Sequence, residues 1–334
     1  MNQSLLPLLT REGMLIKASV SFWRGHKKLK AEDLGLKSQD VSDRLISLGH
    51  KRLLPKESLS ALSVVESRTH ALIDHNTFPF LGGIAHFLPN ARMPEVLEEL
   101  RQLEQQFWLA KEEFLHHYAE LRQKAAAEWL QMAGKLVKHP EQLVASIEAS
   151  FPYPKDMGRY YGFSTHLFQI QLPETLEMDL ITTAEQQAVM RSREQAAREA
   201  GQKIRREVEQ FVGECVASLR EQTAQLCDDM LHSIRNSETG VHQKTLNRLI
   251  RFIDQFKQMN FANDTVMERQ LESVRQELLG RTAEEYRDSR YARQKLIGGL
   301  TQLSQQAREL AKQDAGDLVQ RFGQMGQRKF HLAA

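Results

Sequence analysis

The feature that most constrains this chain is the distribution of its nine prolines. All of them lie at or before Pro173, and residues 174–334 contain none. Proline costs about 3 kcal/mol inside a helix, so a long proline-free segment rich in Gln, Glu, Arg, Ala and Leu favours nearly continuous helix. We therefore expect two domains. Residues 1–173 are predicted to form a mixed helical domain with a small β-sheet, and residues 174–334 a long-helix coiled-coil or bundle domain.

Apolar residues recur at helical spacing through the second domain. One stripe runs from Ile204 to Met230, and a second long helix is expected from Val266 to about Asp314, with Gly280 and Gly298–Gly299 as candidate kinks. The predicted fold is mainly α. We expect an elongated long-helix bundle or antiparallel coiled coil with a small two-stranded β element in the N-terminal half.

The first domain is predicted to mix strands with helices. Residues 15–22 alternate apolar and polar side chains, which is the period of a strand with one buried face. A second candidate strand covers about Tyr160 to Leu172, and we expect the two strands to pair. Between them, the strongest helical period runs from Pro94 to about His139. At 1.5 Å per residue this helix would be roughly 65–70 Å long, which favours an elongated molecule.

Basic residues gather near the N-terminus. The whole chain has a net charge of only +2, whereas residues 1–56 hold eleven Lys and Arg against five Asp and Glu. Clustered cations beside an aromatic ring can hold phosphate and stack on a base. The competing interpretation, which we favour, is that these basic side chains are solvated on the protein surface and that Trp23 closes the core. The candidate nucleic-acid or partner contacts are Trp23, Arg24, Lys27, Lys28, Lys51 and Arg52.

The most apolar segment of the chain is Phe78–Pro89. It is too short to span a bilayer, and no other stretch approaches the required length. Two interpretations remain open. The segment either packs in the core, which we favour, or exposes a docking loop for a partner. The residues of that candidate docking loop are Phe80, Leu81, Gly82 and Gly83.

The sequence lacks the common signatures of catalysis. It has no P-loop, no dinucleotide-binding glycine motif between a strand and a helix, and no G-x-S-x-G elbow. A di-iron site needs a second copy of the Glu113-x-x-His116 motif, and none is present. We expect no enzymatic activity and no cofactor. Weaker candidates for metal or nucleophile chemistry are the trio His70, His75 and His86 and the dyad Cys227–His232.

Several short blocks of the sequence form a recognisable series. They are Val20–Leu29, Glu32–Leu34, Leu48–Arg52 and Phe80–Gly83, with Phe107, Phe114 and Tyr118 on the long helix and Tyr161–Phe163 in the second candidate strand. These blocks resemble an uncharacterised bacterial and phage family that is known only as a domain of unknown function. Its members share a W-x-G-x-K-K-L opening, an L-G-x-K block, an F-L-G-G turn, a long helix with Phe and Tyr near its middle, and a middle strand.

The resemblance implies a biological context rather than a reaction. Genes of this family occur on plasmids, prophages and integrative elements, often near genes for a MoxR-type AAA+ ATPase and a von Willebrand factor A protein. The resemblance therefore implies a non-enzymatic helical adaptor or scaffold that works with these two proteins on a mobile element. Its process would be phage defence or maintenance of the element.

The alternative function is nucleic-acid binding through the N-terminal basic segment. We expect a cytoplasmic protein, because the two cysteines are too few for a disulfide framework. We also expect no membrane span, because no stretch of the sequence is long and apolar enough. Homo-oligomerisation is a further candidate interaction.

Overall fold

The structure is a computed structural model, and it describes residues 5–34, 48–137, 140–171, 184–237 and 240–322. Residue contacts divide the chain into two compact units. The first unit comprises Met1–Lys17, Ile73–Val96 and His166–Ala334, and the second comprises Ala18–Leu72 and Leu97–Thr165. The predicted domain boundary after residue 173 falls in the segment 172–183, outside the described residues, and it stays a prediction.

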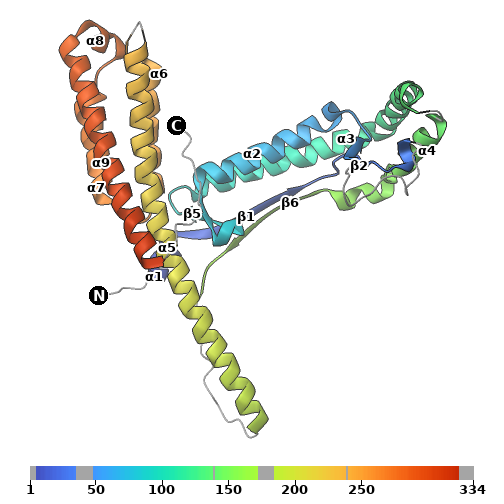
Figure 1. Ribbon diagram of the computed structural model, residues 1–334, viewed down its shortest axis with the longest axis horizontal. Helices are drawn as coiled ribbons and strands as arrows, with labels where there is room; N and C mark the ends of the chain where they lie inside the picture. Colours follow the sequence, from blue (N-terminus) through green and yellow to red (C-terminus); the bar gives the residue numbers. More distant parts are fainter. Residues whose placement is uncertain (1–4, 35–47, 138–139, 172–183, 238–239, 323–334) are drawn as a thin grey trace. The chain divides into compact units, whose positions relative to one another are not determined.

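Long helices dominate the described part of the chain, as predicted (Figure 1). The longest are α3 with 44 residues and α5 with 53. Classification as a bundle or coiled coil stays a prediction. The α-helices are α1 (Leu6–Glu12), α2 (Ser60–Asn76), α3 (Met93–Leu136), α4 (Pro140–Ser150), α5 (Ala184–Asn236), α6 (Gln243–Met259), α7 (Thr265–Leu278), α8 (Ala283–Asp288) and α9 (Arg290–Phe322). Short 3-10 turns are η1 (Glu32–Leu34), η3 (Lys56–Leu59), η4 (Leu81–Gly83) and η5 (Pro154–Tyr160).

The single helix expected from Val266 to Asp314 is wrong, because the chain leaves the helical conformation at two places. The chain leaves the helix after Leu278, passes Gly280 and starts again at Ala283, where Thr282 caps α8 with a reciprocal capping box. In contrast, α9 continues through Gly298–Gly299. The predicted helix is therefore divided at the first candidate kink and not at the second. It is divided again at Ser289, where the backbone is extended between α8 and α9.

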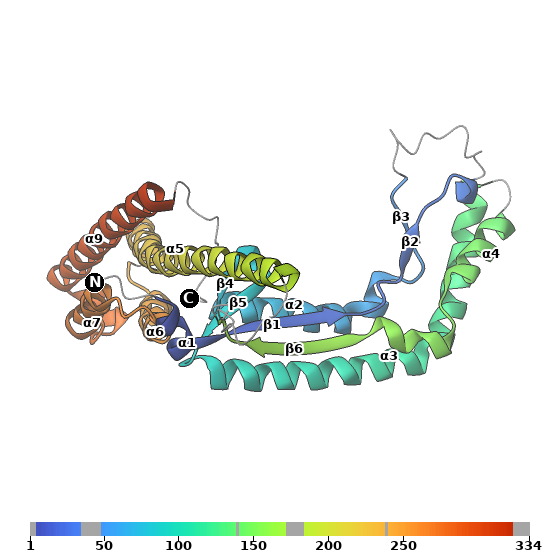
Figure 2. The same ribbon diagram turned by 90° about the horizontal axis from the view of Figure 1, so that it is seen from below.

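The strands form two sheets (Figure 2). The four-stranded sheet has the order β4-β5-β1-β6, so the expected neighbours β1 (Gly13–Ser21) and β6 (Gly162–Phe168) are adjacent. They do not stand alone, because the apolar segment adds β4 (Phe78–Phe80) and β5 (Ala85–Pro89). The small two-stranded sheet of the N-terminal half is built from other residues than predicted, namely β2 (His26–Lys28) and β3 (His50–Arg52).

The core of the first unit is centred on phenylalanine rings. Phe80 and Phe87 meet the ring of Phe211 on α5 at 4.8 and 5.8 Å between centroids, and Phe87 also meets Phe261 at 4.6 Å. All four side chains are buried. Edge-on aromatic packing of this kind stabilises a core beyond the burial of apolar area alone. The β4–β5 hairpin therefore packs against the long helix α5.

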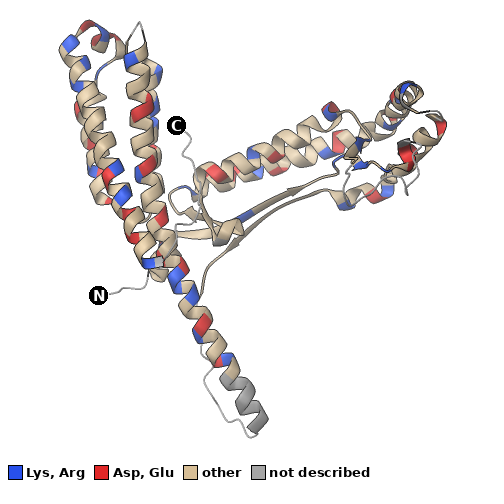
Figure 3. Ribbon diagram, in the orientation of Figure 1, with Lys and Arg blue, Asp and Glu red and all other residues tan. Residues whose placement is uncertain are grey.

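Helices α5 and α9 lie side by side and run antiparallel (Figure 1). Arg220, which precedes Ile234 along α5, forms an ion pair with Asp314 late in α9. Residues late in α5 contact residues early in α9, as where Arg293 donates to the carbonyl of Ile234. Acidic and basic residues are interspersed along the described parts of both helices (Figure 3).

The core of the second unit is also aromatic. The ring of Trp23 lies 5.9 to 6.2 Å from those of Tyr118, Phe151 and Phe114, and the Tyr118 hydroxyl donates to the carbonyl of Pro152 at 2.8 Å. Burial raises the pKa of Tyr118 to about 12. This cluster joins the end of β1 to the middle of α3 and the chain after α4.

Candidate interaction surfaces

The predicted basic contacts lie on or beside the β2–β3 ribbon. Gly25 and Gly49 precede the two strands with φ of +61° and +75°, a conformation that glycine adopts without strain. In the antiparallel register His26 is opposite Arg52 and Lys28 is opposite His50. Directly opposed residues share a face of the ribbon, and neighbours along a strand alternate between faces. Lys27 and Lys51 therefore belong to the other face.

An open groove of about 430 Å³ lies beside this ribbon, and we call it the basic groove. Its floor includes Phe22 and Leu54, which are buried. Among the described residues, no Asp or Glu lines it. The rings of His26 and His50 meet edge to face at 5.1 Å. The charged and titratable side chains that line the groove are Arg24, His26, His50, Arg52 and Lys56.

Arg24 is held in place by two partners. Its guanidinium makes a bidentate ion pair with Glu66 of α2, with N–O distances of 2.5 and 2.7 Å. It also lies 4.0 Å above the ring of Phe22. The hydrogen bond with Glu66 raises the pKa of Arg24, and the same bond lowers the pKa of Glu66. Arg24 is therefore a fixed cation in the wall of the groove.

Lys51 has a different environment from the other predicted contacts. Its side chain is only 3% exposed and forms an ion pair with the equally buried Asp33 at 2.7 Å. The Ser146 hydroxyl on α4 donates to the same carboxylate at 2.8 Å, and the backbone amide of Lys30 donates to its other oxygen at 2.9 Å. This network ties β3 to η1 and α4, so Lys51 is inaccessible to a phosphate.

Trp23 is also inaccessible. It is only 6% exposed, and its ring is enclosed by the aromatic cluster of the second unit. This burial agrees with the favoured interpretation that Trp23 closes the core. Arg52 is exposed on β3, and its backbone carbonyl accepts a hydrogen bond from Trp129 at 2.9 Å. Lys27 and Lys28 are exposed on β2.

The candidate docking loop is split between core and surface. Phe80 is 2% exposed and packs on Phe211. Gly82 and Gly83 are exposed and have φ of +65° and +86°, which lets η4 connect β4 to β5. The backbone of Leu81 lies in this turn, and its side chain falls outside the described structure. Among the described side chains of the segment, Ile84 is the most exposed large apolar one, at 67%.

A second groove lies between α5 and α9 and was missed by the sequence analysis. It has a volume of about 670 Å³, and we call it the alanine groove. Its small side chains are Ala217 and Ala224 of α5 and Ala311 and Ala315 of α9. Its charged side chains include Glu221 and Asp228 on α5 and Arg308 and Lys312 on α9. The seven-residue spacing of the α5 alanines, with an acidic residue four positions after each, was the available sequence signal.

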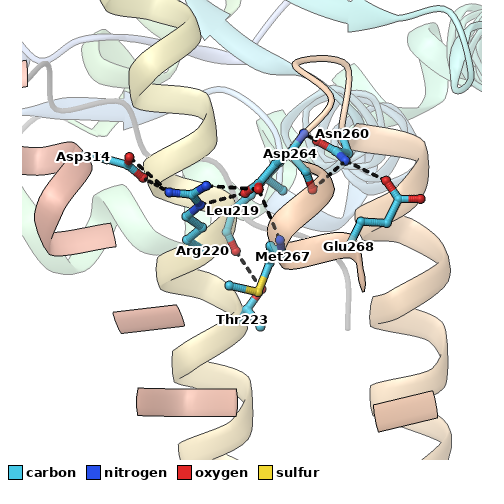
Figure 4. A network of polar contacts seen from close by, with 8 residues as sticks. All are labelled: Leu219, Arg220, Thr223, Asn260, Asp264, Met267, Glu268 and Asp314. Atoms are coloured by element: carbon cyan, nitrogen blue, oxygen red, sulfur yellow. Dashed lines mark hydrogen bonds and ion pairs between the residues drawn. The ribbon is translucent and has the colours of Figure 1, made fainter. Parts of the chain in front are cut away.

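An arginine fixes the two helices that form the alanine groove (Figure 4). Arg220 of α5 pairs with Asp264 at 2.7 Å and with Asp314 of α9 at 2.9 Å. The Asp264 side chain also caps α7 by accepting from the amide of Met267. The hydrogen bond to Asp264 raises the pKa of Arg220, and burial raises the pKa of Asp314. One guanidinium therefore links α5, α9 and the start of α7.

The remaining candidates for chemistry do not come together. The Cys227 thiol is buried, and burial raises its pKa to about 12, which opposes formation of a thiolate nucleophile. His232 is exposed and lies within hydrogen-bonding distance of Asn236. In the part of the chain that the structure describes, no group of three or more His, Cys, Asp or Glu residues could hold a metal ion. None of the described helices is long and apolar enough to cross a membrane.

Comparison with known proteins gives a family but no characterised relative. No curated protein matches the chain, and no solved structure matches it. A family match covers residues 10–287, most of the chain. It includes β1, the β2–β3 ribbon, the β4–β5 hairpin, and helices α2 to α7. The predicted membership of an uncharacterised family is therefore confirmed: the chain belongs to the family described as Protein of unknown function (DUF3150).

Proposed function

We propose that the chain is a non-enzymatic helical adaptor that works with a MoxR-type AAA+ ATPase and a von Willebrand factor A protein on a mobile genetic element. The gene neighbourhood implied by the family resemblance supports the choice of partners. In this role the long helices present a docking surface, and the ATPase supplies the mechanical work. The process served is defence against phage or maintenance of the element.

The observation that carries this proposal is the alanine groove. Ala217 and Ala224 are almost fully buried, so the space between α5 and α9 has a shallow floor of methyl groups. Small side chains let a third helix approach closely and pack into the space between two others. Glu221 of α5 and Lys312 of α9 flank the floor. Asp228 and Arg308, which also line the groove, form an ion pair that connects the two helices. A partner helix with an apolar stripe and charges of both signs beside it fits this surface.

Co-expression tests the proposal. The full chain is co-expressed with the neighbouring ATPase and von Willebrand A protein, purified on a tag, and analysed by size-exclusion chromatography with and without ATP. Ala315→Arg fills the alanine groove and is expected to reduce the amount of partner recovered. Gln313→Arg adds the same charge at an exposed position of α9 and is the control. Failure to recover either partner under any condition would contradict the adaptor role.

A second candidate function is nucleic-acid binding through the N-terminal basic segment. The exposure of Lys27, Lys28 and Arg52 and the basic groove beside them support it. Binding of this kind weakens steeply as salt rises, because phosphate contacts release counterions. The double variant Lys27→Glu and Lys28→Glu should lower the affinity for an oligonucleotide. Lys51→Glu is not a suitable probe, since it would place a carboxylate beside buried Asp33.

A further inference from the structure

The basic groove combines features that suit one class of ligand. It is an open hollow of about 430 Å³ whose described lining contains five basic or titratable side chains and no carboxylate. Its volume lies in the range of small-molecule sites, roughly 300–1,000 Å³. The buried Phe22, Leu54 and Leu59 provide an apolar floor. A ligand with one anionic end and one flat apolar part matches this lining.

The lining of the groove supplies cations of the kind that bind phosphate. Arg52 is exposed on β3 while its backbone is anchored by Trp129, so its guanidinium projects from a fixed strand. Lys56 is exposed at the start of η3. A guanidinium offers a planar fork of donors that matches two phosphate oxygens, and an ammonium adds a point charge. Because Arg24 is already paired with Glu66, Arg52 and Lys56 are the cations of the lining that best suit an anion.

The histidine pair adds a second kind of contact. Both His26 and His50 are exposed, and their rings meet at 90°. Histidine rings can stack on an unpaired base. His26 Nδ1 donates to the carbonyl of Arg24 at 3.2 Å, so the neutral ring has only an acceptor at Nε2. Nε2 can therefore accept a hydrogen bond from a donor group of a base.

We propose that the basic groove binds a nucleotide phosphate, with Arg52 and Lys56 on the phosphate oxygens and the His26–His50 pair beside the base. The phosphate belongs either to a free nucleotide or to the end of a nucleic-acid strand. This inference goes beyond the adaptor role and does not depend on it. It deepens the second candidate function by assigning the contact to the groove face of the ribbon, and it removes Trp23 and Lys51 from the contact set.

Calorimetric titration of the full chain tests the inference with four probes: inorganic phosphate, adenosine monophosphate, and one oligonucleotide with and without a 5′-phosphate. Arg52→Gln and His50→Gln are each expected to weaken binding of adenosine monophosphate about tenfold. Lys27→Gln, on the opposite face of the ribbon, should change it less than twofold. Circular dichroism of each variant checks that the fold is intact.

The pattern across probes separates the proposals. Stronger binding of the phosphorylated oligonucleotide, lost in Arg52→Gln, supports the groove as a strand-end site. Binding of adenosine monophosphate but of neither oligonucleotide supports the groove and contradicts nucleic-acid binding. If oligonucleotide binding depends on Lys27 and Lys28 but not on Arg52, nucleic-acid binding stands and the groove inference is wrong. Absence of binding to all four probes also overturns the inference.

Discussion

Lys27 and Lys51 illustrate how little a residue's type says about its environment. They are directly opposite each other in the β2–β3 ribbon, and both lie in basic clusters of the sequence. Lys27 is exposed, whereas Lys51 is buried with Asp33. The partners of Lys51 are 18 and 95 positions away along the chain. Local sequence therefore identified a basic segment but could not identify which of its lysines is part of the core.

The burial of Lys51 predicts a large effect of its removal. Lys51→Met leaves the Asp33 carboxylate buried without its cation, and we expect a loss of about 3–5 kcal/mol in the free energy of unfolding. Lys27→Met is the matched control on the facing strand and should change stability by less than about 0.5 kcal/mol. Urea titration measures both values. Equal stabilities of the two variants would contradict the account of the buried pair.

The same pair predicts a dependence on pH. Burial alone would raise the pKa of Asp33, but its bonds with Lys51, the Lys30 amide and Ser146 bring it below the ordinary value of 3.8. A carboxyl whose pKa is lowered by folding stabilises the fold above its unfolded-state value, and this contribution is lost as the pH falls through the folded-state value. The destabilisation caused by Asp33→Asn should therefore be largest above about pH 5 and shrink below 3.8. A difference that stays constant between pH 6 and pH 3 would contradict this assignment.

At the scale of elements, periodicity predicted the long helices well and their buried faces less well. The helical period of α3 connects eight apolar residues from Leu100 to Ala125. Six of them are buried, and Ala110 and Leu121 are half-buried. The same period continues to Met132, which is 53% exposed, and the adjacent Ala133 is buried instead. The contacts of a helix change along its length, and one fixed period cannot follow that change.

The β4–β5 hairpin shows a different limit. Its sequence is apolar without alternation and contains Pro79, which lacks the amide that a central strand would need. β4 is the edge strand of its sheet, where a proline is tolerated. Core packing could be predicted from composition, but the strand pairing could not.

Two adjacent glycines of α9 give an element-scale prediction. An added Cβ at Gly298 would meet nothing within 4 Å, whereas at Gly299 it would collide with the side chain of Leu278 on α7. Gly298→Ala should therefore stabilise the protein by about 0.5–1 kcal/mol through helix propensity. In Gly299→Ala the gain is offset by displacing a buried leucine, which costs about 1–3 kcal/mol. Thermal unfolding should rank Gly298→Ala above the wild type and Gly299→Ala at or below it. The reverse order would contradict the close approach of α7 and α9.

At the scale of the whole molecule, the sequence predicted a helical protein of an uncharacterised family, and both statements hold. Each of the two compact units draws on separate stretches of the chain. A change in proline frequency can only separate contiguous segments, so it could not have found this division. Similarly, the two grooves depend on neighbours that are distant in sequence. The basic groove joins residues 22–26 to residues 50–63, and the alanine groove joins residues 214–228 to residues 308–315.

The most direct test of the adaptor role is the mass of the assembly formed by the co-expressed chain, ATPase and von Willebrand A protein. Size-exclusion chromatography with light scattering, run with and without ATP, measures this mass. The adaptor role predicts one species that contains the chain and at least one partner, and that is diminished by Ala315→Arg but not by Gln313→Arg. Three proteins that elute separately at their own masses, with and without ATP, would contradict it.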